Sequence, residues 1–255
     1  MRIDCHSHVA PSPLSKGWTN KELIEAADKL GIDILCCSTP ITRGMPTPEM
    51  VREANNITLR AMREYPDRIL GYCFVNPGYL RESIKELERC IVGEGMIGIK
   101  LYNQYFANEP VVFPIIEKAI EWGVPVLIHA GHATDEATRR SQPRLSDGYH
   151  IAELGIRYPN AIIIEGHIGG GGDWEWSIKA IRKVQNVYLD TSGSVVDEGM
   201  IEMAVDMLGA ERVLFGTDLT MEGGVGKILG ANLTDEEREL IFWRNMKRIL
   251  EMRKV

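Results

Sequence analysis

Eight short apolar runs alternate along the chain with longer segments in which apolar residues recur every three or four positions. The short runs are rich in Val, Ile and Leu, as is usual for parallel strands that are buried on both faces. We expect strands at residues 2–8, 32–38, 69–75, 96–102, 125–129, 161–167, 187–191 and 212–218. The longer segments have the period of amphipathic helices. We expect helices at residues 21–30, 49–65, 80–92, 111–122, 174–184, 197–208 and 235–249, and another that ends at residue 158.

Eight strand–helix units in 255 residues predict a (β/α)8 barrel, an α/β fold that typically takes about 250 residues. A doubly wound open sheet is the alternative, but it would carry a glycine-rich fingerprint after its first strand. The chain has His6-Ser7-His8 at that place. No linker or low-complexity tract divides the sequence, so we expect one domain over residues 1–255. This domain would be a single TIM barrel with short loops, apart from a long polar loop at residues 130–146.

Residues that can bind a metal ion or move a proton occupy the expected carboxyl ends of four strands. His6 and His8 are two positions apart, so in an extended strand both side chains point the same way. His129, His167 and Asp218 end the fifth, sixth and eighth strands. Barrel enzymes place their chemistry at this end of the strands, and three or four imidazoles with one carboxylate suit a zinc ion. We therefore expect these five side chains to converge on the barrel axis.

The composition narrows the choice of partners and compartment. The net charge is −7 and no block of Lys and Arg stands out, which argues against nucleic acid and anionic membranes as partners. No run is long and apolar enough to span a bilayer, and the chain starts directly with a strand. The five cysteines have irregular spacing, which indicates reduced thiols. We expect a cytoplasmic protein that acts on a small molecule, and homodimer formation stays open.

Several short motifs resemble those of the amidohydrolase superfamily. The closer similarity is to the subgroup of metal-dependent hydrolases that includes aminocarboxymuconate-semialdehyde decarboxylase. The matching positions are Asp4-x-His6-x-His8, Gly98-Ile99-Lys100-Leu101, His129, His167-Ile168-Gly169-Gly170, Gly216-Thr217-Asp218 and the late Asn245. The similarity extends from end to end of the chain. It departs from the family after Asp218, where Leu-Thr-Met-Glu stands in place of the proline that the family commonly has nearby.

The resemblance implies one divalent metal ion, usually zinc, with manganese or iron(II) as alternatives. Its ligands would be His6, His8, His129 and Asp218. His167 would stand beside the ion as a base or as a group that polarises the substrate, and Asp218 would also accept a proton from a metal-activated water.

Hydrolysis of an amide or of an ester or lactone bond in a small carboxylated substrate is the first interpretation of this site. Non-oxidative decarboxylation of an unsaturated or aromatic acid is the alternative, because it would use every one of the same ligands. A TatD-like nuclease also contains His-x-His, but it would need a metal-bridging Glu on the fourth strand, where this chain has Lys100. A barrel that binds a metal ion without catalysis is the least favoured hypothesis.

Other residues could complete the site. Alternation along their strands predicts that Lys100 and Glu165 both point into the barrel and pair below the metal ion, since a lone buried charge is costly. Arg43 lies on a loop expected at the catalytic end and could bind a substrate carboxylate. His132 and Tyr102 lie close enough to contact a substrate, although a loop histidine and a packing aromatic are equally ordinary readings.

Overall fold

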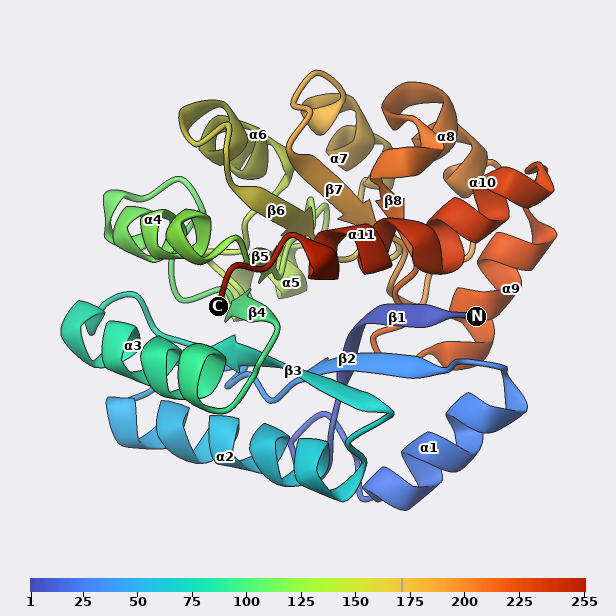
Figure 1. Ribbon diagram of the computed structural model, residues 1–255. Helices are drawn as coiled ribbons and strands as arrows, with labels where there is room; N and C mark the ends of the chain where they lie inside the picture. The colour runs from blue at the N-terminus through green and yellow to red at the C-terminus, as the bar shows by residue number, and fades with distance from the viewer. Residues whose placement is uncertain (171) are drawn as a thin grey trace.

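The computed structural model describes residues 1–170 and 172–255. Eight parallel strands pair in sequence order from β1 to β8 and form a nearly closed barrel with helices around it, so the (β/α)8 prediction is confirmed (Figure 1). The strands are β1 (Ile3–His8), β2 (Ile34–Ser38), β3 (Ile69–Phe74), β4 (Gly98–Leu101), β5 (Pro125–Ile128), β6 (Ile162–Glu165), β7 (Val187–Asp190) and β8 (Val213–Leu214).

The α-helices surround the strands and also cover one end of the barrel. They are α1 (Asn20–Lys29), α2 (Pro48–Glu64), α3 (Leu80–Leu87), α4 (Phe113–Trp122), α5 (Glu136–Ser141), α6 (Gly148–Arg157), α7 (Trp174–Ile181), α8 (Met200–Leu208), α9 (Met221–Gly230), α10 (Asp235–Glu239) and α11 (Asn245–Glu251). Short π-helical segments, Glu88–Gly93 and Leu240–Arg244, follow α3 and precede α11. The last helix, α11, crosses the end of the barrel near the N-terminus (Figure 1).

Two apolar layers hold the barrel together. The inner layer contains Cys5, Tyr72, Leu127 and Ile164 from the strands, and Met246 of α11 packs against it. The outer layer lies between the strands and the surrounding helices. It includes Leu35, Cys73, Ile99, Val126, Ile163 and Leu189. Successive strand residues face opposite sides of the sheet, and both sides are covered by an apolar layer. This explains the near-continuous apolar runs of the sequence.

Hydrogen bonds between β1 and the segment after β8 close the barrel. The amide of Cys5 donates to the carbonyl of Phe215 at 2.8 Å, and the amide of Asp218 donates to the carbonyl of His6 at 2.8 Å. The buried carboxylate of Asp4 accepts hydrogen bonds from the Thr217 hydroxyl at 2.6 Å and the Thr217 amide at 3.0 Å. These contacts fix the first strand against the last, so the residues that follow each of them are held side by side.

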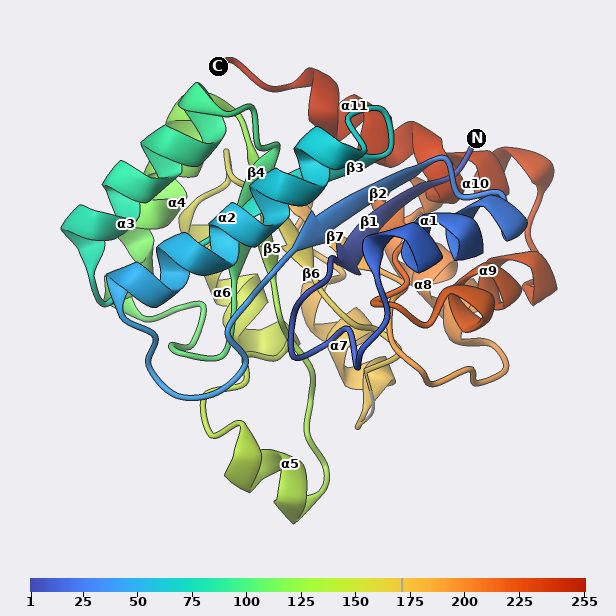
Figure 2. The ribbon, with the colours of Figure 1, turned by 90° about the horizontal axis from the view of Figure 1, so that it is seen from below.

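Two helices were not expected from the sequence. Helix α5 lies within the loop predicted at residues 130–146, and Figure 2 shows that it projects from the end of the barrel opposite α11. Helix α9 contains Gly223, Gly224, Gly226 and Gly230, and glycine lowers helix propensity. Tertiary packing accounts for one of these glycines, because a Cβ at Gly224 would lie 2.9 Å from Cγ2 of Thr217.

The five cysteines are free and buried, so they pack as small apolar residues of the core. Among the helices of residues 1–170 and 172–255, none is long and apolar enough to cross a membrane.

Candidate active site

The carboxyl ends of the strands bring the five predicted side chains to one end of the barrel. His6 and His8 belong to β1, whereas His129, His167 and Asp218 follow β5, β6 and β8. His167 and Asp218 have positive φ angles of 72° and 47°. Non-glycine residues rarely adopt this backbone conformation, and in folded proteins such residues concentrate at functional sites.

His6 is held by a carboxylate on one side and a lysine on the other. Its Nδ1 lies 2.7 Å from Oδ2 of Asp190, and its Nε2 lies 2.8 Å from Nζ of Lys100. All three side chains are fully buried. Because Oδ2 of an ionised carboxylate can only accept, Nδ1 of His6 carries the proton and Nε2 presents a lone pair.

His8 and Asp218 face each other with two acceptor atoms. Nδ1 of His8 lies 2.9 Å from the carbonyl oxygen of Ser38, so this nitrogen carries a proton, and in a neutral ring Nε2 presents a lone pair. Nε2 lies 2.8 Å from Oδ1 of Asp218. Two lone pairs at this distance require a cation between or beside them, which is either a proton or a metal ion.

A chain of hydrogen bonds links His129 and His167 to Gln142, the residue after helix α5. Nε2 of His129 donates to Oε1 of Gln142 at 2.8 Å, which leaves Nδ1 to accept from Nε2 of His167 at 2.8 Å. Nδ1 of His167 then accepts from the Ser192 hydroxyl at 3.1 Å and lies 3.5 Å from Oδ2 of Asp218. The side-chain amide of Gln142 therefore sets the proton positions of both histidines.

The donor set fits a divalent metal ion. Ligand atoms of His6, His167 and Asp218 lie within 4.8 Å of one another, and His8 contacts the same carboxylate. Burial lowers the pKa of His6 to about 4 and that of His167 to about 3, so both imidazoles are neutral at pH 7. Neutral imidazoles and an ionised carboxylate are the forms that bind zinc or manganese. The Asp190–His6 contact has the geometry of a carboxylate that orients a metal-binding histidine.

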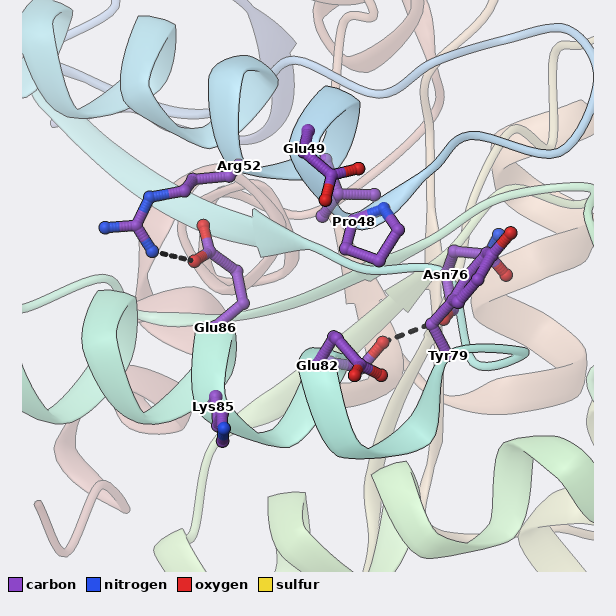
Figure 3. Close-up of a pocket in the computed structure, with 10 residues that line it drawn as sticks. Pro48, Glu49, Arg52, Asn76, Tyr79, Glu82, Lys85 and Glu86 are labelled. Carbon is purple, nitrogen blue, oxygen red and sulfur yellow. Dashed lines mark hydrogen bonds and ion pairs between the residues drawn. The ribbon is translucent and has the colours of Figure 1, made fainter.

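A pocket of about 150 Å³ opens beside these residues and is lined by His129, His167 and Asp218 together with Gln142 and Leu145. A larger pocket of about 540 Å³ lies near it and includes Asn103, which donates to Oε1 of Gln142 at 2.9 Å. Figure 3 shows a third pocket, of about 200 Å³, between α2 and α3, where Arg52 pairs with Glu86 at 3.6 Å. None of the five predicted metal or acid–base residues lines that third pocket.

The additional residues predicted around the site differ in what they contact. Tyr102 stacks on His129, with ring centroids 4.0 Å apart, and so forms part of the site wall. Arg43 is exposed and lines the 540 Å³ pocket. His132 contacts residues outside the predicted metal site, because its Nδ1 lies 3.0 Å from Oδ2 of Asp147 and its ring packs against Trp176. The ordinary reading of a loop histidine therefore fits His132 better than a substrate contact does.

The predicted pair between Lys100 and Glu165 is wrong. Lys100 points into the barrel and contacts His6, as described above. Both carboxyl oxygens of Glu165 are buried without a hydrogen-bond partner among the described residues. Strand β6 ends at Glu165, and the left-handed conformation of His167 breaks the alternation on which the prediction relied. Glu165 therefore faces the helix layer, while His167 turns back to the site.

Replacing Glu165 with glutamine should stabilise the protein at alkaline pH. Burial raises the pKa of Glu165 to about 8, from an unfolded value near 4.3. Between these values the folded state binds the proton and the unfolded state does not, so the wild-type free energy of unfolding falls as pH rises toward 8. Urea unfolding at pH 5 and pH 8 should show that the free energy of unfolding decreases less between these pH values for Glu165→Gln than for the wild type. The exposed variant Glu236→Gln serves as control, and an equal loss in all three proteins would contradict this assignment.

Two important residues, Asp190 and Ser192, were missed. Asp190 ends β7, and its Oδ1 accepts from the amides of His167 at 3.0 Å and Ser192 at 2.8 Å. The Ser192 hydroxyl contacts His167. The available signal was an acidic residue at a strand end, the same feature that singled out Asp218.

Comparison with known proteins gives a family match and several relatives. The amidohydrolase family model matches residues 3–251. A 2-keto-4-carboxy-3-hexenedioate hydratase of Sphingobium sp. is 24% identical over 244 residues, which cover 76% of this chain and 69% of the relative. A 2-amino-3-carboxymuconate-6-semialdehyde decarboxylase of Dictyostelium discoideum is 24% identical over 264 residues, which cover 88% and 72%.

A solved structure shows the same barrel. The dihydroxybenzoic acid decarboxylase of Polaromonas sp., with bound manganese and the inhibitor 2-nitroresorcinol, superposes with a TM-score of 0.77. The two sequences are 17% identical, and the match covers 100% of this chain and 98% of the decarboxylase.

Proposed function

Because this chain belongs to the amidohydrolase family, we propose that it is a metal-dependent lyase that releases CO2 without oxidation from an aromatic or unsaturated carboxylic acid. Family membership makes it an enzyme. Hydrolysis, the first interpretation of the sequence, is less well supported than its alternative, since the similar proteins are decarboxylases and a hydratase.

The donor cluster at the carboxyl ends of the strands is the observation that supports this proposal most. His6, His8 and Asp218 would hold one divalent ion, and the fourth ligand would come from the hydrogen-bonded pair His129 and His167. The resemblance assigns His129 as the ligand, whereas the donor spacing favours His167. Manganese is as well supported as zinc, because the similar decarboxylase contains manganese. A bound divalent ion would polarise an anionic oxygen of the acid and stabilise negative charge as CO2 leaves.

The protein's own groups would place the acid and supply a proton. Decarboxylation breaks a C–C bond, leaves its electron pair on the substrate carbon and requires a proton there. The imidazoles of His129 and His167 line the pocket and contact each other at 2.8 Å. One ring can donate a proton to the substrate carbon and receive a proton from its neighbour, which is in turn reprotonated from solvent. The stacked ring of Tyr102 and the bond to Gln142 would hold His129 in place during this transfer.

The decisive experiment is a substrate screen with manganese- and zinc-loaded protein. Carboxylated phenols and unsaturated di- and tricarboxylic acids would be followed by CO2 release, with lactones and amides as hydrolase substrates. We expect the wild type to release CO2 and a chelator to abolish this activity. The double variant His6→Ala/His8→Ala should bind no metal ion and release no CO2. Turnover of lactones or amides without any decarboxylation would contradict the proposal.

Hydration of a C=C bond is the second candidate, favoured by the similarity to the hydratase from Sphingobium. The same unsaturated acids test it, since hydration adds one water molecule to the substrate and releases no CO2.

A further inference from the structure

Lys100 is the one cation that contacts a proposed metal ligand among the described residues, and nothing in the proposed reaction uses it yet. It lies on β4, is fully buried, and its Nζ is 2.8 Å from Nε2 of His6. A lysine ammonium can only donate hydrogen bonds, so it donates to the lone pair of this nitrogen.

That lone pair is the only one His6 can offer. The other ring nitrogen, Nδ1, carries its proton toward Asp190 at 2.7 Å, and the fully buried Asp190 is fixed by two backbone amides. The ring therefore cannot turn over without losing a buried hydrogen bond to a carboxylate, which is a costly loss. A metal ion and the Lys100 ammonium must consequently use the same atom.

We propose that Lys100 competes with the divalent metal ion for Nε2 of His6, so that metal binding has to displace the ammonium and is weakened by it. This inference rests on the proposed metal site, but it does not depend on which reaction the enzyme catalyses. Repulsion between the ammonium and a divalent cation adds to the competition, because the Lys100 side chain is fully buried and water screens its charge little.

The displaced ammonium requires another acceptor. Asp190 already accepts three hydrogen bonds, and the two oxygens of Asp218 face His8 and His167. An anionic oxygen of the substrate would supply this acceptor. Lys100 would then favour acids over neutral substrates at the moment when the metal ion occupies its place.

The test measures Mn²⁺ affinity, without any substrate, on protein freed of metal by a chelator. Free Mn²⁺ can be quantified by its electron paramagnetic resonance signal. Lys100→Met keeps the length of the side chain and removes its charge and donors. We expect it to bind Mn²⁺ at least tenfold more tightly than the wild type. Lys100→Gln, which keeps a neutral donor, should give a smaller gain.

Lys227→Met is the matched control. Lys227 is also buried, but it donates to the carbonyl oxygens of Thr191 and Gly193 and not to a histidine. Its loss should change Mn²⁺ affinity by less than threefold. Unchanged or weaker Mn²⁺ binding in folded Lys100→Met would overturn the inference. An equal gain in Mn²⁺ affinity in Lys100→Met and Lys227→Met would also overturn it.

A measurement on the wild type makes the test independent of variant folding. Crystal structures with and without Mn²⁺ should show Nζ of Lys100 moving away from Nε2 of His6 when the metal ion binds. Persistence of the 2.8 Å contact beside a bound ion would refute the competition. Failure of the substrate screen would leave these results unaffected, because no step in them requires turnover.

Discussion

Asp218→Asn should lower kcat at least a thousandfold and remove the bound metal ion while leaving the fold intact. Oδ1 and Oδ2 of Asp218 face Nε2 of His8 and Nδ1 of His167, at 2.8 and 3.5 Å. Both nitrogens present lone pairs, so the carboxylate supplies the negative charge that makes a cation favourable between them. A thousandfold loss corresponds to about 4 kcal/mol of transition-state stabilisation.

The amide of the variant would satisfy the site without a metal ion. Its NH2 group can donate to Nε2 of His8, so the melting temperature of the metal-free protein should stay equal or rise. The control is Asp206→Asn, which changes an exposed carboxylate on α8. Metal content, kcat and thermal unfolding would be measured on both variants. A loss of less than tenfold in kcat, with full metal content, would exclude Asp218 from the mechanism.

The barrel and its catalytic end could be predicted from the sequence because both depend on local patterns. Strand and helix periods repeat along the chain, and a barrel places the ends of all its parallel strands together. Knowing that His129, His167 and Asp218 end strands was therefore enough to bring them to one region. The positions of individual side chains within that region follow from backbone features that the periodicity does not contain.

Glu165 and His167 illustrate this limit. Strict alternation puts both on one face, but β6 ends at Glu165 and His167 adopts a φ of 72°. A Cβ at the intervening Gly166 would lie 3.3 Å from Cε1 of His6, so glycine lets the chain pass close to the ring. A register irregularity in β1 between Asp4 and Ser7 likewise breaks the alternation before His8. No apolar pattern signals either break.

Hydrogen-bond partners from distant segments of the chain also could not be predicted from the sequence. Gln142 follows helix α5 and reaches His129 from a segment that the sequence predicts only as a polar loop. Lys100 was correctly placed inside the barrel, yet its acceptor lies on β1 and not on β6. Hydrogen-bond partners across a barrel depend on stagger and side-chain length, which one sequence does not specify. The resulting proton positions nevertheless decide which nitrogen of each histidine is free.

Asp190 offers the sharpest test of those proton positions, because two substitutions should separate its structural and chemical roles. In the wild type, the backbone amides of His167 and Ser192 share Oδ1 of Asp190 at 3.0 and 2.8 Å. In Asp190→Asn, the side-chain amide oxygen can still accept from both. The amide nitrogen would replace Oδ2 and can only donate to Nδ1 of His6. His6 would then carry its proton on Nε2 and lose the lone pair that is proposed to bind the metal ion.

We therefore expect Asp190→Asn to unfold at nearly the wild-type urea concentration but to bind Mn²⁺ about 10- to 100-fold more weakly, the usual effect of losing such a carboxylate partner. Asp190→Ala should in addition lose about 3–5 kcal/mol of stability, since it leaves buried donors unpaired. Urea unfolding and Mn²⁺ titration of both variants measure the two roles separately. Wild-type Mn²⁺ affinity in folded Asp190→Asn would show that the proton on His6 does not control the metal site, and the same result would remove the basis for competition by Lys100.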